Sequence, residues 1–570
     1  MTESTALDFD AARAAISAPG QPYELEEVNV RGVRLSTFVN APAHLGELYE
    51  QSLAHATRDF LVYEDDRLTF ADTYARASEL AAWLVEEAGI GKGERVAIAM
   101  RNYPEWVVAF MAVTATGRIA VPMNAWWTEE EMAYGLTDSG AKWMIVDQER
   151  LDRIAPRLEE MNLRALVARP SMDLALHGGR AEDLAAALER HAGASMPNVE
   201  VHPDEDATIM YTSGTTGFPK GAISTHRAIC SAIMCFESSA AVMALRHPEL
   251  VPADPDAQGA MLLTVPLFHV TGCHAIFLTS FRPGRKMVLM YKWNADDALR
   301  LIEAERVTAF TGVPTMTWEM LQSPKFDDYD TSSLATIGGG GAPAPPEQVR
   351  QVEQKFSGRP GIGYGLTETN AVGAQNAGDD YIQRPRSTGR PPLAVTVEAF
   401  ADDGTQLPRG ELGEIRVFGP VVIRGYWNRE EATAETIVDG WLCSGDVGRV
   451  DEDGFVYIED RKKDMVLRGG ENVYCAEVEA AIYDLDGVRE AIVFGVPDER
   501  LGEEVAAVIV LGEDAATSED AIRAALAPKI AKFKIPAFIR LQTEELPRNA
   551  SGKFLKRAVR DALVEALGRG

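Results

Sequence analysis

The sequence contains few cysteines, and their spacing fits neither disulfide pairs nor a zinc site. Cys230, Cys235, Cys273, Cys443 and Cys475 are an odd number, they are scattered along 570 residues, and none belongs to a C-x-x-C pair. This pattern argues against a disulfide framework and against a zinc ribbon. We expect the cysteines to be small buried residues.

The chain also lacks a hydrophobic run that is long enough to span a membrane. The apolar stretch WVVAFMAVTATG, which starts at Trp106, is interrupted by Arg118, whereas a membrane helix needs about 20 apolar residues. The first residues, MTESTALDFD, are acidic and do not show a basic region followed by an apolar one, as a secretory signal does. These absences predict a cytoplasmic protein with no integral membrane part.

Basic residues are scarce relative to acidic ones. Lys and Arg number 56 against 86 Asp and Glu, so that the formal net charge is −30. This charge repels phosphate groups and therefore disfavours nucleic acid as a partner. It does not exclude a small phosphate-bearing ligand, because electrostatic fields are screened over about 10 Å at 0.1 M salt.

The remaining composition is that of a globular protein with at least two domains. Hydrophobic residues make up 46% of the chain, and single hydrophobic cores stop growing well below 570 residues. Within residues 71–146 and again within 260–337, helical patterns alternate with short apolar runs such as RVAIAM and KMVLMY. This alternation is typical of βα units, so it predicts two α/β layers with mostly parallel sheets. One helix is expected from Ala295 to Glu305.

The pattern changes twice toward the C-terminus. Residues 395–457 contain short strand patterns with turn signals, which predict a small antiparallel β unit. A basic stretch after Asp460, RKKDMVLRGGENVY, is interpreted as a linker, and the residues beyond it alternate between helix and strand patterns. We therefore expect an α/β fold with a large N-terminal domain over residues 1–460 and a small α+β domain over 461–570.

A loop rich in glycine and hydroxyl groups, YTSGTTGFPKG, runs from Tyr211 to Gly221. Free backbone N–H groups and hydroxyl donors suit phosphate oxygens, and Lys220 adds a positive charge. The spacing differs from the P-loop, from the dinucleotide-binding fingerprint and from the serine-hydrolase elbow. Taken alone, such a loop is more often a solvated connection, here between a strand, ATIMY, and a helix, HRAICSAIM.

The loop resembles the signature of the adenylate-forming superfamily, which includes acyl-CoA synthetases, adenylation domains of peptide synthetases and firefly luciferases. Other signatures of that family follow in order, namely PLFHVTG, GGGGAP, YGLTET, GELGEIRVFGPVVIRGYWN, WLCSGDVG, DRKKDMVLRGGENVYCAEVE and PRNASGKFLKR. The resemblance implies that the small C-terminal domain is mobile. It also implies ATP or AMP, Mg²⁺ and coenzyme A as cofactors, and a carboxylic acid as the substrate.

The resemblance implies catalytic roles for four residues. Lys553 bridges the carboxylate and the α-phosphate, Thr367 touches the α-phosphate, Glu368 binds Mg²⁺, and His269 gates the acyl tunnel. One acid is sufficient, because Mg²⁺ prefers few carboxylates plus substrate phosphates. The segment 548–560 holds five basic residues and no acidic one, which suits an anionic ligand. Taken alone, these residues also fit a basic helix start, a capping turn and a structural histidine.

The same resemblance implies a set of nucleotide and coenzyme A residues. The phosphates meet the hydroxyl-rich loop, adenine lies between the GGGGAP segment and Tyr364, and Asp446 accepts hydrogen bonds from the ribose hydroxyls with help from Arg461. Lys463 is the hinge of the small domain, and Gly469 and Gly470 pass the pantetheine arm. The full set is Thr212, Ser213, Gly214, Thr215, Thr216, Gly217, Lys220, Gly340, Gly341, Ala342, Pro343, Tyr364, Gly365, Thr367, Asp446, Arg461, Lys463, Gly469 and Gly470.

The leading hypothesis is an acyl-CoA synthetase that makes acyl-AMP and then acyl-CoA. The resemblance implies that glycines at 338–340 and at Gly363 lie near the acyl site, where they would leave room for a medium-chain, long-chain or aryl-substituted acid. An amide-forming ligase that uses an amine in place of coenzyme A shares these motifs. A luciferase-like enzyme and a nucleotide-binding protein without activity are weaker alternatives, and a homodimer is possible.

Overall fold

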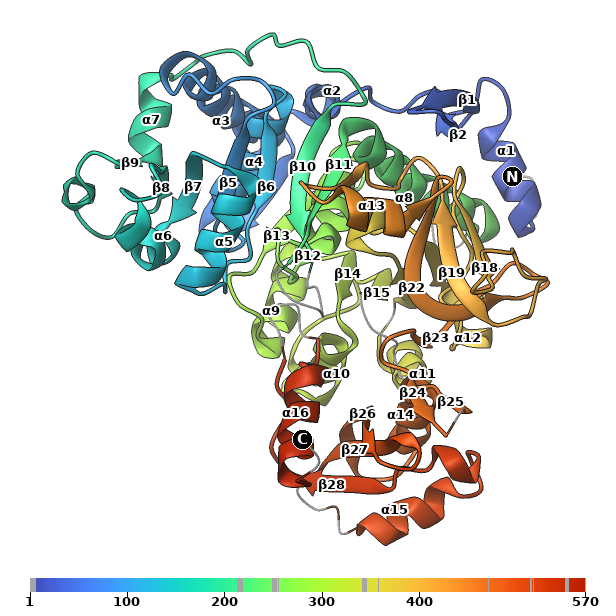
Figure 1. Ribbon diagram of the computed structural model, residues 1–570. Coiled ribbons are helices and arrows are strands. Elements are labelled where there is room, and N and C mark those ends of the chain that lie inside the picture. The colour runs from blue at the N-terminus through green and yellow to red at the C-terminus, as the bar shows by residue number, and fades with distance from the viewer. Residues whose placement is uncertain are drawn as a thin grey trace.

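The computed structural model describes residues 7–212, 219–248, 254, 256–340, 346–356, 358–469, 471–512, 515, 517–548 and 553–568. Figure 1 shows a large part, blue to orange, above a smaller part, red, that contains the C-terminus. The large part contains two eight-stranded sheets, a five-stranded sheet and a hairpin, and the small part contains another five-stranded sheet. The predicted α/β fold class, with a large and a small domain, is confirmed.

The first eight-stranded sheet has the order β20-β11-β10-β6-β5-β7-β8-β9. The strands from β10 to β9 are parallel, whereas β11 and β20 run antiparallel to their neighbours. The bounds are β5 (Arg95–Ala99), β6 (Ile119–Pro122), β7 (Trp143–Asp147), β8 (Arg164–Ala168), β9 (Ala181–Asp183), β10 (Asp206–Tyr211), β11 (Gly221–Thr225) and β20 (Gly425–Tyr426).

The second eight-stranded sheet has the order β17-β16-β15-β14-β12-β13-β3-β4. Its six central strands are parallel, and the edge strands β17 and β4 are antiparallel. The bounds are β3 (Asp59–Tyr63), β4 (Asp66–Thr69), β12 (Ala260–Leu263), β13 (Lys286–Leu289), β14 (Ala309–Gly312), β15 (Thr336–Gly340), β16 (Arg359–Tyr364) and β17 (Ala374–Ala377). The expectation of two α/β layers is therefore confirmed.

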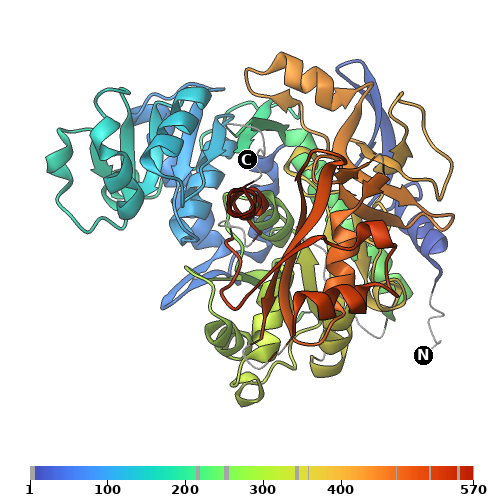
Figure 2. The same cartoon turned by 60° about the horizontal axis from the view of Figure 1, so that its bottom comes forward.

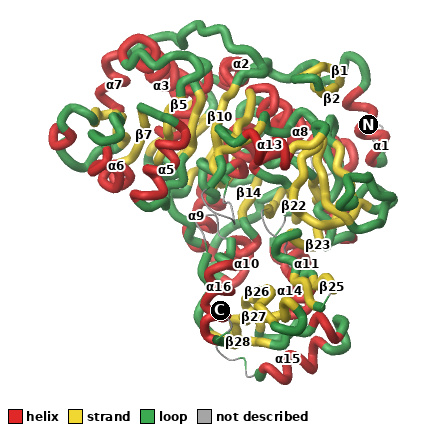
Figure 3. The backbone as a smooth tube through the Cα atoms, viewed as in Figure 1, coloured by secondary structure: helices red, strands yellow, loops and turns green. Residues whose placement is uncertain are grey.

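Helices connect the parallel strands and pack between and around the two sheets (Figure 3). Helix α4 lies between them, because it contacts β5 and β6 of the first sheet and β3 of the second, and nearly all of its side chains are buried. The helices are α2 (Leu45–Gln51), α3 (Phe70–Ala82), α4 (Pro104–Ala115), α5 (Glu129–Ser139), α6 (Gln148–Ile154), α7 (Leu184–Arg190), α8 (His226–Arg246), α9 (Ala295–Glu305), α10 (Pro314–Gln322), α11 (Pro346–Lys355) and α12 (Gly378–Gln383).

Helix α8 is apolar and long enough, at 21 residues, to cross a membrane by length and composition alone. It is instead a core helix, since Ile229, Ile233 and Met234 are fully buried. The apolar run that starts at Trp106 lies in helix α4, which is shorter than α8. The cysteines behave largely as expected. All five are free, and all are buried except Cys443, which is partly exposed.

The five-stranded sheet of the large part is antiparallel, which confirms the β unit predicted between residues 395 and 457. Its elements are β18 (Thr396–Phe400), β19 (Gly413–Phe418), α13 (Glu430–Thr436), β21 (Ile437–Val438), β22 (Trp441–Val450) and β23 (Val456–Arg461). The N-terminal segment contributes α1 (Phe9–Ser17) and the hairpin β1 (Leu25–Val30) with β2 (Val33–Phe38).

The small part has hydrophobic clusters of its own on both faces of its sheet. Its elements are β24 (Val466–Arg468), β25 (Glu471–Val473), α14 (Cys475–Tyr483), β26 (Val488–Asp498), β27 (Gly502–Leu511), α15 (Glu519–Leu526), β28 (Phe538–Gln542) and α16 (Lys556–Ala566). The stretch interpreted as a linker is mostly the hairpin β24–β25, because β24 gains a partner in β27. The domain boundary at residue 460 stays a prediction.

Candidate active site

The hydroxyl-rich loop closes a hairpin between β10 and β11. Tyr211 pairs with Gly221, and the N–H of Thr212 donates a 2.9 Å hydrogen bond to the carbonyl of Lys220. A Cβ on Gly221 would lie 2.6 Å from the side chain of Ile209, so this position requires glycine. The expectation of a strand-to-helix loop is wrong, because the short strand β11 pairs with β10 before α8 begins. Ser213, Gly214, Thr215, Thr216 and Gly217 lie outside the described residues.

Lys220 and Glu368 meet at Tyr426, which lies on β20 beside β11. The ammonium of Lys220 is 4.8 Å from the centre of the Tyr426 ring, and the Tyr426 hydroxyl donates a 2.7 Å hydrogen bond to Glu368 Oε1. Burial and the nearby Glu368 charge raise the pKa of Tyr426, so it stays a donor. We did not single out Tyr426 from the sequence, although it belongs to one of the family signatures.

Thr367 and Glu368 lie in a single 3₁₀ turn, Thr367–Thr369, after β16. The turn folds back so closely that a Cβ on Gly365 would lie 2.2 Å from the carbonyl oxygen of Ala371. It ends at Asn370, whose φ of 52° is left-handed. Because the turn starts no α-helix, the alternative reading of this pair as a helix cap is wrong. Both side chains remain partly exposed, which leaves them accessible to a ligand.

Asp446 is held between Tyr364 and Arg461. The Tyr364 hydroxyl donates a 2.7 Å hydrogen bond to Asp446 Oδ2, and Arg461 Nε lies 2.9 Å from Oδ1. Asp446 is only 2% exposed, and this burial raises the pKa of its carboxyl although Arg461 opposes the shift. Arg461 and Asp446 are register partners on β23 and β22, so the sheet itself places them together. The carboxylate is preorganised as an acceptor of hydrogen bonds.

The glycine-rich strand β15 ends beside β16. Gly340 pairs with Gly363, and a Cβ on Gly340 would lie 3.5 Å from the Gly363 carbonyl oxygen. A Cβ on Gly363 would meet nothing within 4 Å, so space is open on that side of the strand. Gly341, Ala342 and Pro343 lie outside the described residues.

Lys553 belongs to the small part but lies within electrostatic range of this group of residues. Its ammonium interacts electrostatically with Arg461, Asp446 and Glu368, all of which belong to the large part. Burial and the Arg461 charge lower the pKa of Lys553, and the two carboxylates oppose that shift. Figure 2 shows the small part in front of the large part, with α16 seen end-on. The docking of the two parts therefore assembles a site to which both contribute.

His269 is also within electrostatic range of Lys553. Burial and, to a smaller extent, the Lys553 charge lower the pKa of His269 to about 4, so that its imidazole is neutral at neutral pH. The loop that carries it is held by Asn102, whose Nδ2 donates to the carbonyl of Val265 and whose Oδ1 accepts from the N–H of Leu267 at 3.0 Å. We did not single out Asn102 from the sequence, because no local pattern indicates so distant a contact.

An aromatic surface continues from this loop, and we call it the Arg101–Trp126 platform. The rings of Phe268 and Trp126 lie 5.4 Å apart, and the Arg101 guanidinium lies 4.0 Å from the Trp126 ring and 5.0 Å from the Tyr291 ring. Trp126 is 41% exposed. Nε and Nη1 of Arg101 are buried and have no hydrogen-bond partner within the described part of the chain. The platform thus combines an open aromatic face with unused donors.

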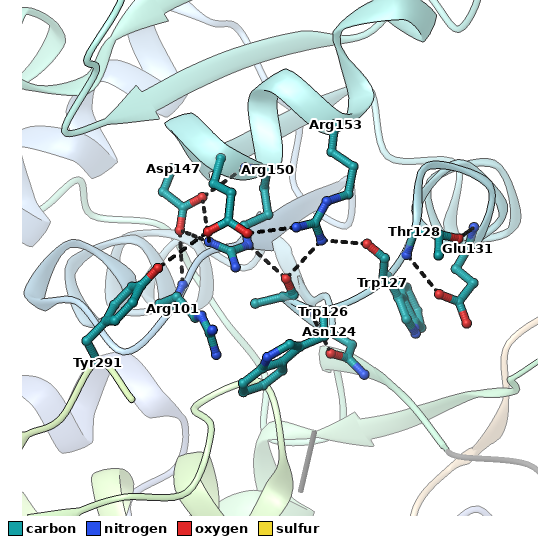
Figure 4. Close-up of polar contacts among 12 residues, drawn as sticks. Arg101, Asn124, Trp126, Trp127, Thr128, Glu131, Asp147, Arg150, Arg153 and Tyr291 are labelled. Carbon is teal, nitrogen blue, oxygen red and sulfur yellow. Dashed lines mark hydrogen bonds and ion pairs between the residues drawn. The ribbon is translucent and has the colours of Figure 1, made fainter. Parts of the chain in front are cut away.

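A buried ion pair and several hydrogen bonds fix the backbone of the platform, as Figure 4 shows. Arg150 pairs with Asp147 at 3.0 Å and donates to the carbonyl of Ala125, and Arg153 donates to the carbonyl of Trp127. The N–H of Arg101 donates to Asp147 at 3.2 Å. Residues on both sides of Trp126 are therefore anchored to α6, which limits the movement of its ring.

The segment between the two parts holds Lys463 in a tight turn. The N–H groups of Asp464 and Met465 both donate to the carbonyl of Arg461. Burial and the Arg461 charge lower the pKa of Lys463. Gly469 has a φ of 59°, and its N–H donates a hydrogen bond to the carbonyl of Leu501 in the small part. Among the described residues, Gly469 forms no hydrogen bond with Glu368 or Asp446. Gly470 lies outside the described residues.

No cluster of three or more His, Cys, Asp or Glu side chains that could hold a metal ion by itself occurs in the described ranges. Glu368 has one carboxylate oxygen bound to Tyr426 and remains partly exposed. This arrangement fits an ion such as Mg²⁺, which takes one or two carboxylates and completes its shell with phosphates and water.

The family model named AMP-binding enzyme matches residues 48–427, and the model named AMP-binding enzyme C-terminal domain matches residues 477–553. The chain belongs to the AMP-binding enzyme family. Its nucleotide is therefore ATP or AMP, and the resemblance to adenylate-forming enzymes seen in the sequence is confirmed. The first match lies within the large part of the fold and the second within the small part.

Named relatives of this AMP-binding enzyme are similar over most of its length. It is 35% identical over 497 residues, 87% of this chain and 93% of the relative, to the long-chain-fatty-acid–CoA ligase FadD13 of Mycobacterium tuberculosis. It is 34% identical over 501 residues, 86% and 93% of the two chains, to a feruloyl-CoA synthase of Amycolatopsis sp. ATP-bound MatB from Rhodopseudomonas palustris is similar in structure, with a TM-score of 0.79, 29% identity and coverage of 92% and 99%.

Proposed function

We propose that this AMP-binding enzyme is a carboxylic acid–CoA ligase that forms AMP. The observation that carries the proposal is that Lys553 of the small part is within electrostatic reach of Glu368 and Asp446 of the large part. In the first half-reaction, a carboxylate oxygen attacks the α-phosphorus of ATP and pyrophosphate leaves. In the second, the thiol of coenzyme A attacks the acyl carbonyl, loses its proton, and AMP leaves.

The residues of the site suit the first half-reaction. Lys553 is placed to bind the substrate carboxylate and the α-phosphate together, which offsets their mutual repulsion as they approach. Asp446, fixed by Tyr364 and Arg461, accepts hydrogen bonds from the ribose hydroxyls. The hydroxyl of Thr367 donates a hydrogen bond to an oxygen of the α-phosphate. Mg²⁺, held by Glu368 when bound, supplies positive charge at the phosphate oxygens.

The acid is a monocarboxylic acid with a medium, long or aryl-substituted chain. The open space beside Gly363 and the neutral imidazole of His269 both suit an uncharged chain. The name of one relative specifies a long-chain fatty acid and the name of another a feruloyl group, which supports these classes.

Coenzyme A is the acceptor, and its nucleotide end binds the Arg101–Trp126 platform. An exposed indole face suits adenine, and the unused guanidinium donors suit phosphate. Phe268 links the platform to His269, so a pantetheine arm can run from the platform to the acyl carbonyl. After the small domain turns about Lys463, Gly469 and Gly470 line that arm with bare backbone.

The redox state of the cysteines indicates the compartment in which the reaction takes place. All five are free thiols, which are typical of proteins in a reducing compartment. We therefore place the reaction in the cytoplasm.

A panel of free acids tests the function directly. The purified protein is incubated with MgATP and each acid, with and without coenzyme A, while AMP and thioester are measured. We expect AMP release that depends on a medium-chain, long-chain or aryl acid, together with a thioester when coenzyme A is present. AMP release that requires an amine and yields no thioester would instead identify an amide ligase. No ATP consumption with any acid would refute both.

A further inference from the structure

A carboxylate on the large-domain side of the hinge is bound by the small domain. Asp460 lies on β23, before Lys463, and is 8% exposed. Its Oδ2 accepts a hydrogen bond from the N–H of Cys475, the first residue of α14, and its Oδ1 accepts one from the N–H of Arg461 at 2.7 Å. The N-terminus of a helix attracts negative charge, which strengthens the contact between Asp460 and α14.

Lys556 joins the same cluster from the other end of the small domain. It is the first residue of α16 and follows closely on Lys553. Its ammonium lies 3.6 Å from Glu479 Oε1 on α14 and interacts electrostatically with Asp460 and Asp464. Although burial opposes the charge, Glu479, Cys475 and these two aspartates raise the pKa of Lys556, so it stays protonated. The segment that carries Lys553 therefore acts on Asp460 through the charge of Lys556, whereas the 3.6 Å ion pair between Lys556 and Glu479 lies within the small domain.

We propose that Asp460 and Lys556 form a latch across the hinge, which holds Lys553 at the nucleotide site and must open before the small domain can turn. The proposal rests on the proposed function, in which the domain turns about Lys463 between the half-reactions. Asp460 acts as a positioning residue and touches no substrate.

The order of the residues along the chain explains why the latch must open. Asp460 precedes the pivot at Lys463, whereas Cys475 and Lys556 follow it, so rotation about the pivot moves them relative to Asp460. The ion pair between Lys534 and Glu477, at 2.6 Å, has both members beyond the pivot and is carried along unchanged. The latch therefore stabilises one arrangement selectively, whereas the Lys534–Glu477 pair stabilises the small domain in every arrangement.

The two half-reactions, measured separately, test the latch. Pyrophosphate exchange reports adenylation, and thioester formation from supplied acyl-AMP reports the second step. Asp460→Asn weakens the hydrogen bond to the N-terminus of α14, and Lys556→Met removes the positive charge that acts on Asp460. For both variants we expect exchange to fall about tenfold, while thioester formation is unchanged or faster. Lys556→Arg keeps the charge and should restore exchange. Lys534→Met, the matched control, should leave the ratio of the two rates as in the unmodified protein.

A distance measurement gives a readout that does not depend on activity. Dyes are attached to cysteines introduced at Leu176 and Arg500, both exposed, with Cys443 replaced by serine. In the protein without ligands, Asp460→Asn should broaden the distance distribution between the dyes, and Lys534→Met should not. An unchanged distribution, or an equal loss in both half-reactions, would overturn the latch.

The outcomes separate the latch from the function on which it rests. A broadened distribution in a protein that forms no thioester with any acid would support the latch and refute the ligase. If thermal unfolding shows that Lys556→Met does not fold, the other two variants still test the latch. Asp460→Asn keeps the shape of the aspartate side chain, and Lys556→Arg keeps the positive charge.

Discussion

The hydroxyl of Tyr426, on β20 of the first sheet, donates a 2.7 Å hydrogen bond to Glu368, which lies in the 3₁₀ turn after β16 of the second sheet. Tyr426 lies beside β11 at the edge of the first sheet, and its ring faces the Lys220 ammonium. Its contact with Glu368 therefore joins Lys220 to the turn that carries Thr367. The proposed sites for phosphate and for Mg²⁺ therefore share one supporting side chain.

Replacing Tyr426 with Phe removes this hydrogen bond but keeps the ring that faces Lys220. Glu368 then loses the donor that orients it, so we expect the KM for MgATP to rise about threefold to tenfold, in line with the net contribution of one typical hydrogen bond. Pyrophosphate exchange at several Mg²⁺ concentrations measures the effect. An unchanged KM would show that Tyr426 does not position Glu368.

Replacing Lys553 with Ala should slow adenylation by at least about 10² to 10³, as the loss of one preorganised charge-stabilising donor does in other enzymes. Pyrophosphate exchange is the measurement, and Lys532→Ala, which is exposed in the same domain, is the control. If exchange in Lys553→Ala equals that of the unmodified protein, Lys553 has no part in the first half-reaction.

Replacing Lys463 with Pro restricts the backbone at the proposed pivot. We expect thioester formation to suffer more than adenylation, since only the second half-reaction requires the small domain to turn. The ratio of the two rates, each measured alone, is the readout. Equal losses in both would contradict the assignment of the hinge.

Replacing Arg101 with Met removes the guanidinium but keeps much of the packing against Trp126. We expect the KM for coenzyme A to rise about tenfold, as expected for the loss of a charge-assisted contact to phosphate, with pyrophosphate exchange unchanged. Repeating the assay with pantetheine as the acceptor is the control, because pantetheine lacks the nucleotide and should be insensitive to the change. A KM for coenzyme A that stays the same would place its nucleotide elsewhere.

A lower pH should decrease the free energy of unfolding, because His274 is fully buried. Burial lowers the pKa of His274 from 6.5 to about 3. The unfolded chain then binds a proton more readily than the folded protein does. The neutral ring contributes fully to the free energy of unfolding above pH 6.5. This contribution falls by about 1.4 kcal/mol per pH unit as the pH is lowered toward 3.

The variant His274→Gln cannot take up that proton. The difference in the free energy of unfolding between the unmodified protein and the variant should shrink as the pH is lowered from about 6 to about 4. Chemical denaturation at each pH provides the values, with the exposed His202→Gln as the control. Parallel pH curves for the unmodified protein and His274→Gln would show that His274 takes up a proton in the folded state.

Local sequence patterns were sufficient to predict a helix where one short stretch contains both the hydrophobic periodicity and the residues that begin and end the helix. Helix α9 spans Ala295–Glu305 as predicted, because Asn294 caps its N-terminus and one face is regularly apolar. Helix α15 ends at Leu526, since Pro528 follows and cannot donate within a helix. The strands β11 and β24 were missed because they are short and are stabilised by distant partners.

The sequence by itself determined the family, the α/β class and the residues proposed for the chemistry, because family signatures and hydrophobic periodicity are local properties of a chain. Only the tertiary structure decided that Tyr426 donates to Glu368, that Asn102 and Arg101 lie beside the loop of His269, and that Lys553 is within electrostatic range of Asp446. These interactions join segments that are far apart in sequence. Their formation depends on how sheets and domains pack, which no short stretch of sequence encodes.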